Sequence, residues 1–293
     1  MSASARARWL GRGAATPYLL SLPSWLYLSV FFVVPLAAML SMSLATGNPL
    51  VGYVFDWHFA EFARAVDQYW VQLVRSFWYG ALSTFLTLVL TYPVAYWIAF
   101  HGGRHKGTVL FLILLPFFVS FVIRTLAWQF LLADQGLILG TLKSWGLLPQ
   151  TTYLLSTPAA VIGGLVYNSV AYYVLPLYVA LEKIDRRVVR AAGDLYASPA
   201  STFWRVVLPL SAPGIFAGFL LVFVTNVGDF VNAAVLGGPG TRMVGNIIQY
   251  NFFDAQNYPM AATLSSILMF LLIVAIYLYA RVFGTESIQE YAT

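Results

Sequence analysis

Long runs of residues without charge dominate this chain, and shorter segments between them carry most of its charged side chains. Each run approaches or exceeds the ~20 residues that an α-helix needs to cross ~30 Å of membrane hydrocarbon. We therefore expect an all-α membrane protein with six transmembrane helices in a single domain at 17–284. The expected spans lie at about 17–45, 76–100, 107–132, 157–181, 212–236 and 260–280.

The segments between the spans predict further elements. Residues 46–70 mix charged and aromatic side chains and should form an external loop with some helix. The apolar stretch 136–148 is too short to span and favours an interfacial or re-entrant helix on the outer face. The first span follows a basic tail at 1–16, as in a signal peptide, but its apolar run is nearly twice a signal peptide's. We expect it to be uncleaved.

Composition supports a lipid environment, because 60% of the 293 residues are hydrophobic and only 9% are charged. Soluble domains carry about 25% charged residues. The absence of cysteine excludes disulfides, thiol catalysis and thiolate metal sites. The net charge of +5 does not form a continuous basic stripe, so we expect no nucleic-acid partner.

The distribution of Lys and Arg predicts the orientation. With the amino terminus inside, the inner segments hold eleven basic residues and the outer segments three, or four with Arg75 at a span's edge. Inner loops retain positive charge, so both termini (tails 1–16 and 285–293) and the loop 183–209 should be cytoplasmic. The inner residues are Arg6, Arg8, Arg12, Arg104, Lys106, Lys183, Arg186, Arg187, Arg190, Arg205 and Arg281, and the outer ones Arg64, Lys143 and Arg242.

The loop 183–209 predicts two short amphipathic helices. Asp185 can cap the first, and Ser198 followed by Pro199 indicates a second start. Pro209 and Pro213 then interrupt the chain before the next span. One apolar stripe is expected on the first helix, formed by Val188, Val189, Ala192, Leu195 and Tyr196.

This loop resembles the cytoplasmic EAA loop of ABC importer permeases, with about a dozen positions in order without a gap. The resemblance implies that the loop docks in a groove of an ATPase and transmits its closure to the membrane helices. The coupling residues would be Arg190, Ala191, Ala192, Asp194, Leu195, Tyr196, Ala197 and Ser198, and the junction residues Leu208, Pro209, Pro213 and Gly214.

Two residues depart from the family pattern. Arg190 stands where the family usually has Glu, and Tyr196 where it usually has Gly. Arg190 can pair with Asp194 at i+4. We expect a compensating acid in the ATPase groove near Arg190. The alternative is a basic surface loop that only satisfies membrane topology.

Further segments, at 114–128, 157–185 and 245–262, resemble the first permease subunit of spermidine/putrescine importers. Permeases for ferric iron, thiamine, opines and phosphonates share parts of the pattern. The resemblance implies the type I importer fold in the bacterial inner membrane and a small cationic substrate. It also implies a second homologous permease, two ATPase subunits that carry ATP and Mg, and an external substrate-binding protein, with no cofactor on this chain.

Two charged residues lie within the expected spans. Arg124 and Asp229 are at similar depth in the outer half of the bilayer, and they could pair as part of a gate, or Asp229 could face a cationic substrate. Alternatively Arg124 reaches the outer headgroups and Asp229 forms a static ion pair or ends a helix.

Tyr167, Asn168, Asn226 and Asn232 offer ring faces and amide oxygens that suit an alkylammonium in transit, but they suit helix packing equally. The candidate path therefore comprises these four residues together with Arg124 and Asp229.

Two other classes of protein remain as alternatives. A secondary transporter or channel would need coupling carboxylates or a filter in its spans, where only Asp229 is available. An intramembrane enzyme would need converging catalytic groups, but His58, His101 and His105 lie outside the expected spans. No Walker-type sequence occurs, so we expect that the chain is not its own ATPase and has no catalytic residues. His101 and His105 could bind a metal in principle, but such a pair in a loop is more often a solvated basic turn, and we expect no metal site.

Overall fold

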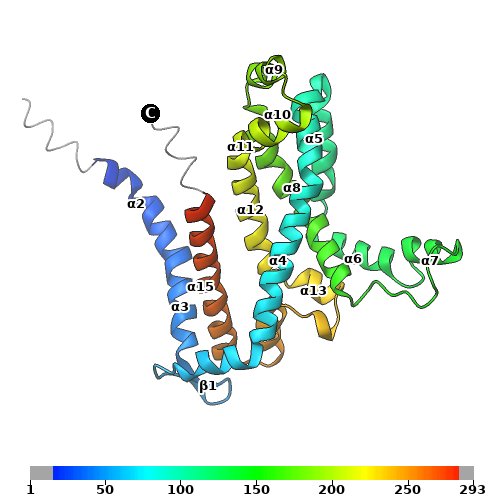
Figure 1. Cartoon of the computed structure of the whole chain (residues 1–293). Helices are drawn as coiled ribbons and strands as arrows, with labels where there is room; N and C mark the ends of the chain where they lie inside the picture. Colours follow the sequence, from blue (N-terminus) through cyan, green and yellow to red (C-terminus); the bar gives the residue numbers. More distant parts are fainter. Residues whose placement is uncertain (1–15, 284–293) are drawn as a thin grey trace, which may run out of the picture.

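The computed structural model describes residues 16–283, and its long elements are helices (Figure 1). The expected terminal tails lie outside these residues, except Thr16. The long helices are α2 (Thr16–Leu28), α3 (Val34–Ser43), α4 (Ala60–His101), α5 (Lys106–Leu114), α6 (Phe121–Leu132), α8 (Pro158–Glu182), α12 (Ala212–Val227) and α15 (Tyr258–Phe283). The short ones are α7 (Leu137–Ser144), α9 (Arg186–Asp194), α10 (Pro199–Thr202), α11 (Leu208–Leu210), α13 (Val231–Val235) and α14 (Val244–Gln249). Single turns of tighter or wider helix are η1 (Ser29–Val33), η2 (Gly103–His105), η3 (Leu115–Phe118), η4 (Phe203–Val207), η5 (Pro239–Thr241) and η6 (Tyr250–Asp254).

Within residues 16–283, five helical stretches are long and apolar enough to cross a membrane. A sixth results when Pro199–Leu210 and Ala212–Val227, which meet at 63°, are counted as one bent span. The expected multi-pass helical architecture is therefore confirmed. The five stretches are Leu20–Ser43, Ala60–His101, Phe121–Ser144, Pro158–Glu182 and Tyr258–Val282.

The continuous helix expected at 107–132 is interrupted in its middle. Pro116 lies in η3, where its missing N–H cannot continue the α-helical hydrogen bonds. Val119 is extended (φ −83°, ψ 142°) before α6 begins. In Figure 1, α6 and α7 project to the side of the bundle. The expected span at 212–236 is likewise broken, between α12 and α13.

A β-hairpin precedes α4, in the segment for which the sequence predicted only a loop with some helix. Strands β1 (Ala45–Asn48) and β2 (Gly52–Phe55) pair antiparallel. Asn48 closes the turn because its Oδ1 accepts the N–H groups of Leu50 and Val51, both at 3.0 Å. The sequence did not predict this hairpin, and the fold is otherwise helical within residues 16–283.

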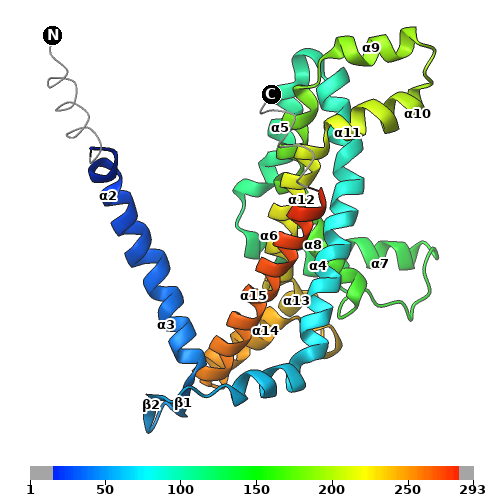
Figure 2. The ribbon, with the colours of Figure 1, turned by 60° about the vertical axis from the view of Figure 1, so that its left-hand side comes forward.

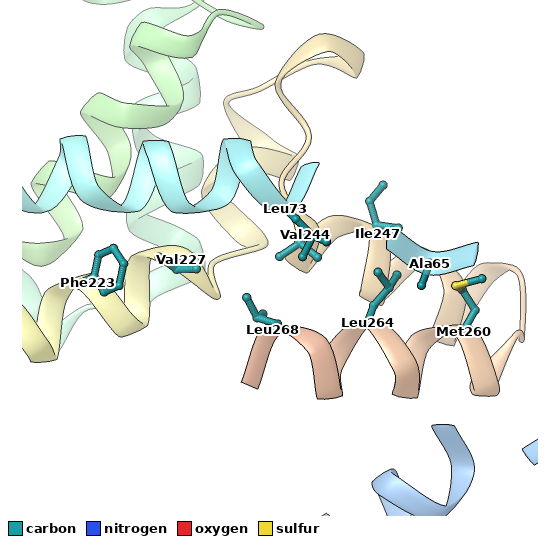
Figure 3. Packing of buried hydrophobic residues seen from close by; sticks show 9 residues of the cluster. All are labelled: Ala65, Leu73, Phe223, Val227, Val244, Ile247, Met260, Leu264 and Leu268. Atoms are coloured by element: carbon teal, nitrogen blue, oxygen red, sulfur yellow. The ribbon is translucent and has the colours of Figure 1, made fainter. Parts of the chain in front are cut away.

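The core forms where α4, α8, α12 and α15 pack together. One buried cluster near the hairpin end joins α4, α12, α14 and α15 (Figure 3). A second cluster, nearer α9, includes Tyr92, Tyr173, Leu177 and Val207. Helices α2 and α3 diverge from the bundle toward the α9 end (Figure 2).

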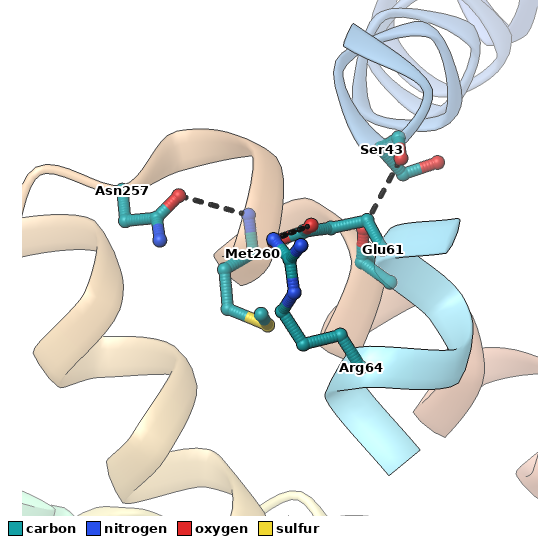
Figure 4. A network of polar contacts seen from close by, with 6 residues as sticks. Ser43, Glu61, Arg64, Asn257 and Met260 are labelled. Atoms are coloured by element: carbon teal, nitrogen blue, oxygen red, sulfur yellow. Dashed lines mark hydrogen bonds and ion pairs between the residues drawn. The ribbon is translucent and has the colours of Figure 1, made fainter. Parts of the chain in front are cut away.

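One polar contact at the β-hairpin end joins α3 to α15, and two others lie within α4 and at the start of α15 (Figure 4). The Thr263 hydroxyl of α15 donates to the Ser43 carbonyl of α3 at 3.1 Å. Arg64 and Glu61 of α4 form an ion pair at 2.8 Å. The Asn257 side chain accepts the N–H of Met260 at 3.3 Å, at the start of α15.

Candidate functional site

Helices α9 and α10 form a protruding helical hairpin at the end of the molecule opposite β1 and β2 (Figure 1). The Asp185 carboxylate accepts the N–H of Arg187 at 2.8 Å and caps α9. The Ser198 hydroxyl accepts the N–H of Ser201 at 3.2 Å, and Pro199 is the first residue of α10. Both predicted caps are confirmed. They fix where each short helix starts.

The turn between these helices has the hydrogen bonds of a Schellman C-cap. The N–H of Ala197 donates to the Ala192 carbonyl at 3.0 Å, and that of Tyr196 to the Gly193 carbonyl at 2.9 Å. Tyr196 is left-handed, with φ 59°. This is the position at which glycine is usually found, because a Cβ is unfavourable there.

The single apolar stripe predicted along α9 is divided in the structure. Val189 packs against the cluster that contains Leu181 and Ile184, whereas Leu195 is 81% exposed and Tyr196 98% exposed. The physical reason is the C-cap, which ends the helix at Asp194, so the next two residues leave the helical period.

The other predicted coupling residues are mainly at the surface. Arg190, Ala191, Asp194 and Ser198 are exposed, whereas Ala192 and Ala197 are partly buried. The ion pair considered for Arg190 and Asp194 is not present among the ion pairs of residues 16–283.

Several contacts attach this helical hairpin to the bundle. The Arg186 guanidinium donates to the Ala99 carbonyl at the end of α4, at 2.9 Å. The Phe203 ring meets the Tyr92 ring edge-on at 5.4 Å, and Val207 is fully buried. Sequence reasoning did not identify Arg186 as an anchor, because the pattern does not show which loop residue meets α4.

The predicted junction residues surround a bend at Ser211. Leu208 and Pro209 belong to α11, and Pro213 and Gly214 to the first turn of α12. Ser211 is buried; its hydroxyl donates to the Leu208 carbonyl at 2.9 Å and lies 2.9 Å from the Tyr92 hydroxyl.

A cavity of about 580 Å³ lies beside α8, α12 and α13. It contains four of the six predicted path residues, Asn168, Asn226, Asp229 and Asn232. The Tyr167 ring instead packs edge-on against Trp128 at 5.2 Å. The lining consists of Phe121, Asn168, Ser169, Tyr172, Val224, Thr225, Asn226, Gly228, Asp229, Phe230, Val231 and Asn232.

Hydrogen bonds connect the amides of this cavity to three helices. The Asn168 Nδ2 donates to Asn232 Oδ1 at 3.0 Å and to the Thr125 hydroxyl of α6 at 3.2 Å. In a second set, the Ser169 hydroxyl donates to Asn226 Oδ1 at 2.8 Å.

Asn226 Nδ2 in turn donates to the Ser83 hydroxyl of α4 at 2.9 Å. Sequence reasoning missed Ser83, Thr125 and Ser169. A signal for Ser83 was present, because Ser, Thr and Gly recur at three- and four-residue spacing along 76–91.

The two charged residues of the expected spans are not paired with each other in this conformation. Arg124 is 7% exposed, and its guanidinium lies over the Phe117 ring at 4.2 Å. It therefore does not extend to the surface. Within residues 16–283, no three His, Asp or Glu side chains gather in a way that could hold a metal ion.

The relatives of this chain are transport proteins. It is 34% identical over 260 residues to the spermidine/putrescine transport system permease protein PotB of Haemophilus influenzae, covering 88% of this chain and 90% of the relative. It is 31% identical over 264 residues to PotB of Escherichia coli, covering 90% of this chain and 95% of the relative.

A solved structure shares the fold. It is a chain of a bacterial ABC transporter involved in the import of the acidic polysaccharide alginate, with a TM-score of 0.73 and 17% identity. The match covers 96% of this chain and 99% of that one. The family model for the binding-protein-dependent transport system inner membrane component matches residues 10–284. This chain therefore belongs to the family of inner-membrane permease components of binding-protein-dependent ABC transporters, as its sequence led us to expect.

Proposed function

We propose that this chain is one of two homologous permease subunits of an ATP-driven importer of polyamines such as spermidine and putrescine. The relatives named spermidine/putrescine transport system permease protein are 31–34% identical to this chain over about 90% of its length. The substrate would arrive on an external binding protein. ATP and Mg would bind to two separate ATPase subunits and not to this chain.

The observation that carries the coupling part of the proposal is the exposed helical hairpin α9–α10. It presents Leu195 and Tyr196 to solvent, beyond a capped helix end, while Arg186, Phe203 and Val207 attach its base to the bundle. An exposed apolar tip, held by a capped turn on a packed base, is suited to docking in a groove and to transmitting force. The ATPase groove is the proposed partner, which places α9 and α10 in the cytoplasm.

The positive charge of Arg190 on α9 indicates that the ATPase groove is acidic. Arg190 is exposed, and none of the ion pairs within residues 16–283 involves it. An acidic residue of the ATPase facing Arg190 would complement this charge, and such a contact at an interface rim mainly affects association. Arg190→Glu should weaken assembly with the native ATPase, and normal assembly and ATP hydrolysis in this variant would contradict the acidic groove.

The test of the function is reconstitution of the complete complex in lipid vesicles. We expect uptake of radiolabelled spermidine and putrescine to require both ATP and the loaded binding protein. Uptake without ATP would favour a secondary transporter or channel. ATP-dependent uptake of ferric iron, thiamine, an opine or a phosphonate, but not of polyamines, would keep the transporter class and replace the substrate.

A further inference from the structure

The cavity beside α8, α12 and α13 carries negative charge at one residue, Asp229. Asp229 follows the C-terminal end of α12, a helix of 16 residues, where the unpaired carbonyls carry partial negative charge. The side chain is partly exposed in the cavity. None of the ion pairs within residues 16–283 neutralises it.

The carboxylate of Asp229 has acceptor capacity to spare. Its oxygens accept the backbone N–H of Asn232 at 2.8 Å and the Asn232 amide at 3.1 Å. An ionised carboxylate offers about four lone-pair sites. The contacts with Asn232 alone make Asp229 a cap for the short helix α13, a role for which a negative charge is not needed.

Asp229 also sets the direction of the neighbouring amides. Because a carboxylate only accepts, Asn232 must turn its Nδ2 toward Asp229 and its Oδ1 toward Asn168. Asn168 then donates through Nδ2. Its own Oδ1 is buried and has no hydrogen-bond donor. The relay therefore ends on a buried oxygen that has no donor in this structure, and the exposed acceptor at the cavity end of the relay is the Asp229 carboxylate.

We propose that this cavity binds one primary ammonium group of the substrate inside the membrane, with Asp229 as the charged ligand. An ammonium group is compact and has three donors and no acceptor, which matches a carboxylate and a series of oriented amides. The rings of Phe121, Tyr172 and Phe230 also line the cavity and can face a cation. This site rests on the proposed polyamine function and assigns one of its contacts to this subunit.

The test uses the complete complex in lipid vesicles and the variant Asp229→Asn. Asparagine keeps an oxygen that can cap α13 but removes the charge. ATP-driven uptake of putrescine at sub-saturating concentration should fall about 10- to 100-fold, as expected for the loss of a charged hydrogen bond. Asp229→Glu should restore part of the rate. Unchanged uptake by Asp229→Asn would overturn the inference.

A matched control is Asp67→Asn, which removes an exposed carboxylate outside the cavity and should not change uptake. If Asp229→Asn fails to assemble, Tyr172→Leu provides the second test, because this side chain is 50% exposed and its loss should not disturb folding. Uptake should fall about two- to fivefold in Tyr172→Leu but not in Tyr172→Phe. Wild-type rates in Tyr172→Leu would also overturn the site.

The two proposals fail in different ways. If the wild-type complex imports no polyamine, the proposed function is wrong. If the wild-type complex imports polyamines and the cavity variants do so equally well, the function stands and the ammonium site is wrong.

Discussion

Tyr196 provides the most informative single substitution in this chain. Its backbone conformation lowers the stability of the turn, whereas its ring should strengthen docking to the ATPase. The left-handed conformation (φ 59°) costs a non-glycine residue about 1–2 kcal/mol. The ring is 98% exposed, so it gains almost no stability within the chain. Tyr196→Gly should therefore stabilise the turn by relieving this strain. About 0.5–1 kcal/mol of that gain is lost because glycine has greater backbone freedom to lose on folding.

The opposite effect is expected on docking to the ATPase. An aromatic ring that becomes fully buried removes about 150 Å² or more from water, and large interface anchors contribute at least about 2 kcal/mol. Tyr196→Gly should consequently bind the ATPase about 30-fold more weakly, despite its more stable turn. The assay is titration of the ATPase onto permease in nanodiscs, together with hydrogen exchange of residues 195–197.

Two further variants separate the ring from the backbone. Tyr196→Asn tolerates the left-handed conformation but lacks the ring, so it should bind as weakly as Tyr196→Gly. Tyr196→Phe keeps the ring and should bind like the wild type. Equal or tighter binding by Tyr196→Gly would refute the reasoning and reduce Tyr196 to a strained surface residue.

Two more predictions concern the packing that supports the coupling end. A Cβ at Gly218 would lie 2.6 Å from ring atoms of Tyr173, so Gly218→Ala should destabilise the subunit by about 1–3 kcal/mol in thermal unfolding. Gly163→Ala, where a Cβ meets nothing within 4 Å, should be neutral or slightly stabilising, and equal effects of the two would contradict this packing. Tyr92→Phe removes the hydroxyl contact with Ser211 and should cost about 1 kcal/mol of stability. It should also lower polyamine uptake per ATP hydrolysed, and an unchanged ratio would show that this contact does not transmit motion.

Local chemistry explains which features the sequence could predict. Asp185 and Ser198 cap helices through N–H groups two or three residues away, so their roles are readable from neighbouring residues. Gly218 stands four positions after Gly214, a spacing of small residues that permits close helix approach, and α12 packs on α8 at both glycines.

Features that depend on tertiary contacts were not predictable from periodicity. The break before α6 falls in a run whose hydropathy suits a continuous span, and only Pro116 indicates it. The cavity was foreseen as separate polar residues, but their connection through Ser83, Thr125 and Ser169 requires the packing of α4, α6 and α8. Arg124 shows the same limit, because its position over Phe117 depends on how the chain folds back at that break.

The hydroxyl groups along α4 have a consequence for movement between helices. Thr84, Thr87 and Thr91 donate to carbonyls one turn earlier in their own helix, so they do not bond to α12. Two hydrogen bonds join α4 to the bent α11–α12 unit. Asn226 donates to Ser83 near one end of α12, and the hydroxyls of Tyr92 and Ser211 form the other at its start. Most of this contact is therefore non-directional, and α12 can slide or rotate on α4 without passing through many broken polar bonds. The energy barrier between two arrangements of these helices should then depend mainly on two side chains at opposite ends of α12.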